Sequence, residues 1–176
     1  MSILNSSFIL TKEEILKLLK AQPPLLENLY DIEQQVQPNG IDLTTKEIAS
    51  FESAGIVAPE NSQRVLSATK KLPFDKTGSL WLSPGCYLVT CNEIINIPGN
   101  IMALAATRSS LLRCGVSVQT AVWDAGYSGR SQALMIIHNP QGFKIFQNAR
   151  FIQLVFFHLG KQVSEGYKGI FQKENI

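Results

Sequence analysis

Short apolar runs separated by proline, glycine and asparagine fill most of the chain after residue 24. Such runs, rich in Ile, Val and Phe and bounded by turn-forming residues, are typical of β-strands. Clear examples are the segments QPNGIDLT, GIVAPENSQRVL, SLWLSPGCYLVTC and EIINIPGNI. The hydrophobic pattern therefore predicts a mainly β protein.

A different pattern precedes these strands. Thr11, followed by acidic residues at Glu13 and Glu14, is typical of a helix N-cap. The apolar residues that come next have helical spacing. They are Ile15, Leu18 and Leu19, and the pattern ends at Pro23-Pro24. We therefore expect residues 1–24 to form an N-terminal helical segment packed on the rest.

Two further apolar runs, SQALMIIHNPQGFKIF and ARFIQLVFFHL, flank a turn at residues 139–142. They predict a hairpin or an adjacent antiparallel pair. After Leu159 the chain becomes polar and rich in glycine, which predicts a mobile C-terminal arm over residues 160–176. The whole chain suits one domain, residues 1–176, with a barrel or sandwich of the jelly-roll kind after the helix.

Composition narrows the classes of partner. Hydrophobic residues make up 45% of the chain and charged residues 17%, as in a folded globular protein. The net charge of +2 comes from scattered basic residues, which predicts no nucleic-acid partner but allows a small anionic ligand. Signal-peptide features are missing, and no apolar run approaches the roughly 20 residues that span a bilayer. We therefore expect a cytoplasmic protein without a membrane partner.

Several kinds of reactive site are disfavoured. Cys86, Cys91 and Cys114 lack CxxC spacing and lie in apolar, strand-like context, so we expect buried free thiols in a reducing compartment. His138 and His158 are isolated on apolar strands and are interpreted as satisfied core histidines. The sequence also lacks the Walker, Rossmann, zinc-deaminase and GxSxG motifs.

The segment RSSLLRCG combines cations and hydroxyls that could bind phosphate. Arg108, Ser109 and Ser110 follow the apolar run 101–106, so we place them where a strand ends and a helical turn begins. Arg113 adds a second positive charge. The alternative is that Ser109 or Ser110 simply caps a short helix.

Asp124 lies in the turn sequence DAGYSG and could orient a water. Tyr127 could pack against a sugar, and the glycines at 126 and 129 would let backbone approach a ligand. The alternative is an ordinary turn aspartate whose side chain binds nearby N–H groups. Together with the phosphate-type cluster, Asp124 favours hydrolysis of a phosphate compound.

Three weaker candidates complete the set. Asp42, in QPNGIDLT, could help to hold a hydrated Mg²⁺ or could cap a turn. Gln153, polar among hydrophobic residues and close to Arg150, should have a hydrogen-bond partner. The segment GYKGIFQ, residues 166–172, could close over a nucleotide as a lid, or be a disordered tail.

In this order, the motifs resemble those of the dUTPase and dCTP deaminase superfamily, and we identify the chain with its archaeal-type dUTPase branch. The segments that carry the resemblance cover nearly the whole chain: QPNGIDLT, PGCYLV, EIINIP, RSSLLRCG, DAGYSG, ARFIQLVF and the GYKGIFQ tail. The resemblance implies a jelly-roll-like (β-clip) subunit, a homotrimer with active sites between subunits, Mg²⁺ and a deoxypyrimidine triphosphate substrate.

The resemblance also implies roles for individual residues. Asp124 would be the catalytic acid, Asp42 would lie near the metal through water, and Tyr127 would lie under the deoxyribose. The triphosphate would be bound by Arg108, Ser109, Ser110, Arg113, Arg150, Gln153 and Lys168. Besides Tyr127, the residues expected near the base and sugar are Gln119, Thr120, Ala121, Tyr167 and Gln172.

Deaminases of this superfamily use a glutamate on the strand after the DAGYSG motif, and residues 130–138 contain no acid. Proton transfer to ammonia would then lack a carrier, which favours hydrolysis of dUTP to dUMP and pyrophosphate. That reaction keeps uracil out of DNA and supplies dUMP. A dCTP deaminase, a bifunctional enzyme and a non-catalytic nucleotide-binding regulator remain the alternatives.

Overall fold

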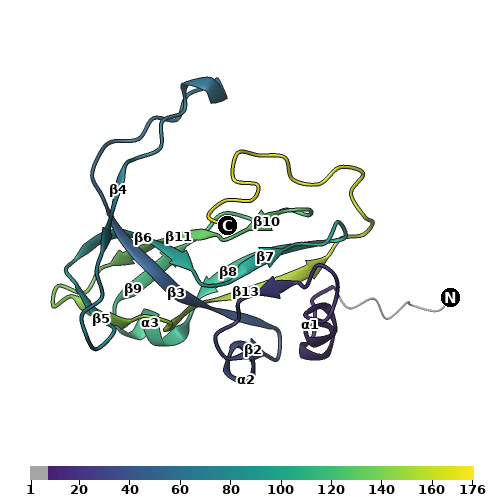
Figure 1. The fold of residues 1–176 in the computed structure, drawn as a ribbon, viewed down its shortest axis with the longest axis horizontal. Helices are drawn as coiled ribbons and strands as arrows, with labels where there is room; N and C mark the ends of the chain where they lie inside the picture. Colours follow the sequence, from purple (N-terminus) through teal and green to yellow (C-terminus); the bar gives the residue numbers. More distant parts are fainter. Residues whose placement is uncertain (1–7) are drawn as a thin grey trace.

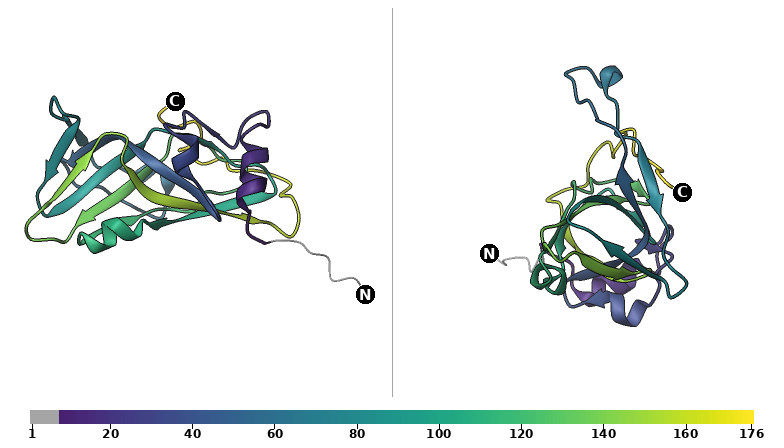
Figure 2. Two further views of the ribbon diagram at one scale, coloured as in Figure 1. Left: turned by 90° about the horizontal axis from the view of Figure 1, so that it is seen from below. Right: turned by 90° about the vertical axis from the view of Figure 1, so that its left-hand side faces the viewer.

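A long sheet that curls almost fully round on itself forms the body of the protein (Figure 1; Figure 2, right). The computed structural model describes residues 8–176. Eight strands form this sheet, in the order β8-β13-β3-β6-β11-β9, with β2 and β4 also paired to β3. They are β2 (Val36–Gln37), β3 (Gly40–Phe51), β4 (Thr69–Leu72), β6 (Gly85–Cys91), β8 (Ile101–Thr107), β9 (Val116–Gln119), β11 (Gln132–Ile137) and β13 (Arg150–His158).

The two ends of this strand order meet through a side chain. Thr107 Oγ1, at the end of β8, donates to Val118 O (3.1 Å) and accepts from Val118 N (2.9 Å) on β9. Two smaller sheets complete the β-structure, one of β1 (Leu26–Glu27), β7 (Ile94–Asn96) and β10 (Ser128–Gly129), the other of β5 (Ser79–Leu82) and β12 (Phe143–Phe146). The prediction of a mainly β, barrel-like subunit is therefore confirmed.

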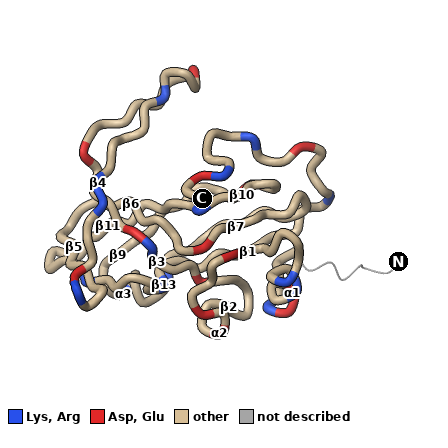
Figure 3. The backbone as a smooth tube through the Cα atoms, viewed as in Figure 1, with Lys and Arg blue, Asp and Glu red and all other residues tan. Residues whose placement is uncertain are grey.

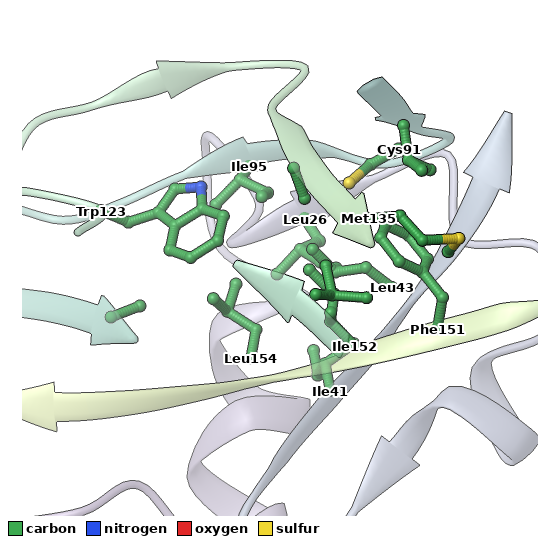
Figure 4. Packing of buried hydrophobic residues seen from close by; sticks show 14 of the residues in the cluster. Leu26, Ile41, Leu43, Cys91, Ile95, Trp123, Met135, Phe151, Ile152 and Leu154 are labelled. Atoms are coloured by element: carbon green, nitrogen blue, oxygen red, sulfur yellow. The ribbon is translucent and has the colours of Figure 1, made fainter. Parts of the chain in front are cut away.

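The core lies inside the barrel, where alternate residues of each strand point inward. On β13, Phe151, Ile152, Leu154 and Phe156 are fully buried. They pack with residues of β3, β11 and the segment before the Asp124 turn, as Figure 4 shows for Ile41, Leu43, Met135 and Trp123.

Within residues 8–176, three short helices and one 3-10 turn lie outside the barrel: α1 (Lys12–Leu18), α2 (Ile32–Gln35), α3 (Ser109–Arg113) and η1 (Asn61–Gln63). The α1 helix confirms the helix predicted after Thr11, whereas residues 1–7 of the predicted N-terminal segment lie outside the described residues. Thr11 caps it, Glu14 reaches back to the Thr11 N–H (2.8 Å), and Ile15 is buried. None of the helices within residues 8–176 is long and apolar enough to cross a membrane.

Strand pairing differs from the predicted hairpin. The runs around residues 131–146 and 149–159 contain β11, β12 and β13, which do not pair with one another. Instead β11 pairs with β6 and β9, β12 with β5, and β13 with β3 and β8. The prediction was wrong because closing the barrel selects distant partners that a local turn signal does not reveal.

The segment GIVAPENSQRVL also differs from expectation. Residues 52–68 leave the barrel between β3 and β4 as a protruding loop, and the pairing that they make is an isolated bridge between Ile56 and Val65 (Figures 1 and 2). Several apolar side chains of this loop are exposed. With no core to cover them in this chain, apolar character alone does not produce a strand here.

Two predictions about burial need correction. All three cysteines are free, as expected, but Cys86 and Cys114 are exposed, and Cys91 alone of the three is buried. His138 and His158 lie at or just beyond strand ends and contact Ser117 and Glu14, so they are not core residues. Their positions at the rim of the barrel explain the exposure.

Residues 160–176 run back across the barrel beside β10 (Figure 1, yellow). We call this segment the C-terminal arm. It has no helix or strand, and hydrogen bonds described below dock it on the Asp124 turn. Its mobility stays a prediction.

Candidate functional site

Residues identified from the sequence gather at two places. We call Asp42, Arg108 and Arg150 the arginine cluster. The cavity beside Asp124, between its turn and the C-terminal arm, is the acid pocket. Residues on or directly after strands build the arginine cluster, whereas a turn and the C-terminal arm wall the acid pocket.

Neighbouring strands bring the arginine cluster together. Asp42 lies on β3, Arg150 begins β13, and Arg108 directly follows β8; these strands are adjacent in the order β8-β13-β3. Asp42 Oδ2 lies 2.9 Å from Arg108 Nε and 3.3 Å from Arg150 Nη1. Asp42 is not a turn cap, because it lies within β3, near the start of that strand, and is buried.

The net charge of the arginine cluster favours the binding of an anion. The Asp42 side chain is almost fully buried, whereas the two arginine side chains keep between a quarter and a third of their surface exposed. Burial raises the pKa of the Asp42 carboxyl, and the two guanidinium groups offset part of that shift. With Asp42 ionised, two positive charges face one negative charge, so the exposed surface of the cluster is cationic.

The predicted serines lie next to this cluster. The β8 strand ends at Thr107 and α3 begins at Ser109, as the sequence predicted. Arg108 is the N-cap residue and makes no side-chain cap bond, so neither serine caps the helix. Ser109, Ser110 and Arg113 are exposed. Gln153 pairs with Asp42 in strand register, but its side chain has no hydrogen-bond partner within residues 8–176.

The acid pocket has a volume of about 330 Å³. Two segments wall it, residues 121–132 and the C-terminal arm. Its lining residues are Ala121, Val122, Trp123, Asp124, Tyr127, Ser131, Gln132, Tyr167, Phe171 and Glu174. The predicted residues Asp124, Tyr127, Ala121 and Tyr167 are therefore brought together, although they come from distant parts of the chain.

Backbone bonds fix the turn that carries Asp124. Trp123 bridges Ala103 of β8, and the Tyr127 N–H donates to Asp124 O (3.1 Å). Gly126 has φ +85°, a conformation that favours glycine. The Asp124 carboxylate is exposed, and no residue between 8 and 176 donates a hydrogen bond to it. It is thus not the self-bonded turn aspartate of the alternative interpretation, and it is available to a water or a ligand.

A buried polar network lies behind Asp124. The Tyr127 hydroxyl donates to Glu174 Oε1 (2.8 Å) and lies 2.8 Å from Ser131 Oγ, which accepts from Trp123 Nε1 (2.7 Å). Desolvation raises the pKa of both Tyr127 and Glu174.

The arm is held mainly through backbone groups. Tyr167 N donates to Ala125 O (2.8 Å), and Arg130 N donates to Glu174 O (2.9 Å). The Gln172 side chain accepts from Ser128 N and donates to Gly126 O, each at 2.9 Å. The Tyr167 ring also contacts Tyr127 edge to face, with centroids 5.7 Å apart.

The other predicted residues lie outside the pocket wall. Gln119 ends β9, Thr120 follows it, and Gln172 contacts the Asp124 turn from outside. Lys168 is exposed on the arm and forms an ion pair with Glu165. Whether these residues touch a ligand stays a prediction.

Glu174 is the residue that sequence reasoning missed. Residues 130–138 do lack an acid, but the arm places the Glu174 carboxylate beside Ser131 and Gln132 in the same pocket. The expectation that the site lacks a carboxylate able to carry a proton is therefore wrong. The available signal was weak, since an individual acid in the polar segment after Leu159 gives no sign of docking.

The arginine cluster and the acid pocket lie far apart in one chain. Trp123, next to Asp124, bridges Ala103, whereas Arg108 follows Thr107, which lies four residues further along β8. An extended strand rises about 3.3 Å per residue, so the Cα atoms of Ala103 and Thr107 are about 13 Å apart. A single subunit therefore does not place Asp124 against the arginines.

Residues 8–176 by themselves offer no metal-binding cage. Within residues 8–176, no three His, Cys, Asp or Glu side chains are grouped so that they could hold an ion. Asp42, the predicted neighbour of Mg²⁺, already contacts two guanidinium groups through Oδ2. Because those contacts neutralise the carboxylate, these residues do not fit a metal held by protein ligands.

Comparison with known proteins finds a matching family model and several relatives that share one enzyme name. A family model described as dCTP deaminase-like matches residues 9–159. A protein of Methanosarcina mazei named probable deoxyuridine 5'-triphosphate nucleotidohydrolase is 52% identical over 95% of this chain and 98% of its own length. A similarly named protein of Archaeoglobus fulgidus is 40% identical over 96% of this chain and 98% of its own.

A third relative, the deoxyuridine 5'-triphosphate nucleotidohydrolase of Methanocaldococcus jannaschii, is 36% identical over 83% of this chain and 94% of its own. Among solved structures, 2'-deoxycytidine 5'-triphosphate deaminase of Agrobacterium tumefaciens superposes with a TM-score of 0.67 at 24% identity. That match covers 88% of this chain and 49% of the other, and it shows similarity of fold.

Proposed function

The chain belongs to the dCTP deaminase-like family, and from this premise we propose that it hydrolyses dUTP to dUMP and pyrophosphate. The observation that carries the proposal is the exposed carboxylate of Asp124, which has no partner within residues 8–176, at the wall of a cavity lined by aromatic rings. The names of the relatives, at up to 52% identity over nearly the full length, support the same substrate.

Asp124 is the group that would activate the water. Its carboxylate would orient a water and accept its proton while the water oxygen forms a bond to the α-phosphorus. The bond between the α-phosphorus and its bridging oxygen breaks, and pyrophosphate leaves. Tyr127 would pack under the deoxyribose, and residues 119–122 would contact the base.

The triphosphate needs the arginine cluster. Arg108 and Arg150 are partly exposed and fixed in place by Asp42, which suits them to hold negatively charged oxygens. Ser109, Ser110 and Arg113 lie beside them on α3, and Gln153 and Lys168 complete the proposed set. These groups would offset the charge that develops on the leaving pyrophosphate.

We further propose that the active site forms between subunits of a homotrimer. The separation of the arginine cluster from the acid pocket along β8 supports this arrangement, because Asp124 of one subunit would need the arginines of another. Mg²⁺ would then accompany the triphosphate, since the protein groups present do not form a cage for it.

A second candidate, dCTP deamination, is favoured by one observation. Glu174 brings a carboxylate into the acid pocket, where a proton carrier for attack at a cytosine ring would be needed. Hydrolysis remains the main proposal because the relatives named above are nucleotidohydrolases.

The test of Asp124 is its replacement by asparagine. D124N removes the base but keeps the size of the side chain, so pyrophosphate release from dUTP should fall at least about a hundredfold while dUTP binding is retained. Glu60, an exposed acid without a side-chain cap bond, offers the control variant E60Q. Turnover by D124N at the rate of E60Q would refute the proposed role.

The choice of reaction is tested with two substrates. Purified protein should release pyrophosphate from dUTP and no ammonia from dCTP. If dCTP instead yields ammonia and E174Q abolishes it, the second candidate is correct. Binding of dUTP without release of any product would mean that the chain is a nucleotide-binding regulator.

A further inference from the structure

Four side chains form a continuous hydrogen-bonded chain from Trp123, next to Asp124, to the C-terminal arm. In order these are Trp123, Ser131, Tyr127 and Glu174, with neighbouring polar atoms 2.7 to 2.8 Å apart. The first three belong to the Asp124 turn and the start of the next strand. Glu174 is the sole member from the arm.

Donors and acceptors determine the direction of this chain. An indole N–H only donates, so Ser131 Oγ accepts from Trp123. The hydrogen of the Tyr127 hydroxyl points to Glu174, because an ionised carboxylate only accepts. The hydrogen of Ser131 must then point to the oxygen of Tyr127. Every donor therefore points toward the arm, and the series ends on the Glu174 carboxylate.

Burial makes that last acceptor important. Trp123, Tyr127 and Ser131 are each at most 6% exposed, so water has little access to replace a lost partner. Buried polar groups without partners destabilise the arrangement that contains them. Without Glu174, the Tyr127 hydroxyl would lose its acceptor, and the orientations of the Tyr127 ring and the Trp123 side chain would be less restricted.

We propose that Glu174 is a positioning residue for the hydrolysis, which fixes Tyr127 and, through Ser131, Trp123 beside Asp124. The acid pocket then takes its working shape when the C-terminal arm is docked. This inference rests on the proposed function, in which Tyr127 lies under the deoxyribose and Asp124 activates the water. Glu174 itself need not touch the substrate.

The natural tryptophans allow a direct test. The sequence has two, Trp81 and Trp123, and Trp81 lies on β5, 63% exposed and outside the pocket. In a W81F background, Trp123 becomes the sole tryptophan. Its fluorescence, and its quenching by acrylamide, would report on the network without any substrate.

Three variants in that background separate the possible roles of Glu174. E174A removes the acceptor, E174Q keeps an amide oxygen that can accept from Tyr127, and E60Q changes an exposed acid outside both the network and the proposed binding residues. We expect E174A to lower kcat for dUTP about tenfold through misplacement of the pocket. It should also raise acrylamide quenching of Trp123 about twofold. E174Q should restore both to within about twofold of the parent, and E60Q should change neither.

A double-mutant cycle tests the connection through Tyr127. In Y127F the hydroxyl is absent, so adding E174A should lower kcat no further if the two residues act as one unit. Fully additive losses, an E174Q variant as impaired as E174A, or E174A with unchanged kcat and quenching would each overturn the proposal. If the parent releases no pyrophosphate from dUTP, the proposed function fails, whereas the quenching data still decide whether the network exists.

Discussion

Replacement of Gly126 by alanine would show how closely the C-terminal arm and the Asp124 turn depend on each other. Gly126 has φ +85°, and a Cβ there would lie 2.7 Å from Gly166 Cα and 3.1 Å from Tyr167 N. These are backbone atoms of the arm, so no side-chain rotation relieves the clash. Gly78 is a matched control, because its φ is +75° and a Cβ there meets nothing within 4 Å.

The two variants share one loss of stability and differ in another. Alanine in the left-handed region costs about 1–2 kcal/mol, and reduced freedom of the unfolded chain offsets about 0.4–1 kcal/mol of it. G78A should therefore lose about 1 kcal/mol of unfolding free energy. G126A should also break the bonds of Tyr167 N to Ala125 O and of Gln172 to Gly126 O, each contributing about 0.5–1.5 kcal/mol. Its total loss should be about 2–4 kcal/mol.

Urea unfolding gives the free energies, and limited trypsin digestion gives the state of the arm, which contains Lys161, Lys168 and Lys173. Cleavage within the arm should be much faster in G126A than in G78A or the parent. Equal stabilities for the two variants, within about 0.5 kcal/mol, together with equal cleavage rates, would refute the inference that arm and turn pack backbone to backbone.

Three more outcomes can be checked. Inactive R108A and D124N chains, refolded together, should regain about a quarter of the parent rate if each site of a trimer takes Asp124 and Arg108 from different subunits; no recovery in mixed oligomers would place both residues in one subunit. Docking of the arm should weaken as the pH rises, because burial raises the pKa of docked Glu174 above its ordinary value of 4.5, so the docked state binds more protons. In the W81F protein, acrylamide quenching of Trp123 should therefore increase as the pH rises from 4.5 past the pKa of docked Glu174. The control is the E174Q variant, in which quenching should not depend on pH. Native protein should react with a thiol reagent at Cys86 and Cys114 but not at Cys91, which is buried and whose thiol pKa is raised by desolvation; rapid labelling of all three would contradict the described core.

Features that depend on nearby residues could be predicted from the sequence. The Thr11 cap, the end of a strand before Arg108 and the turn at Asp124 follow from residue types a few positions apart, and each was confirmed. Strand pairing could not be predicted in this way, because β11 and β13 find partners on opposite sides of the barrel.

In the candidate site, too, local features could be predicted, but the arrangement of distant segments could not. Asp124 and the arginines could be identified by motif, but their separation along β8 depends on the sheet. Glu174 contributes to the acid pocket through the path of the C-terminal arm, which has no periodic pattern to follow. A docked coil is fixed by individual hydrogen bonds, and these leave little trace in composition.

The position of β13 has a consequence for how the protein is made. Among the strands described within residues 8–176, β13 (residues 150–158) is synthesised last, yet it lies between β3 and β8 near one end of the sheet order. Until then both neighbours expose an unpaired edge, and the apolar interior that Phe151 and Phe156 complete stays open to water. Nascent chains that end before β13 are therefore at risk of aggregation, and barrel closure must follow synthesis of residues 150–158.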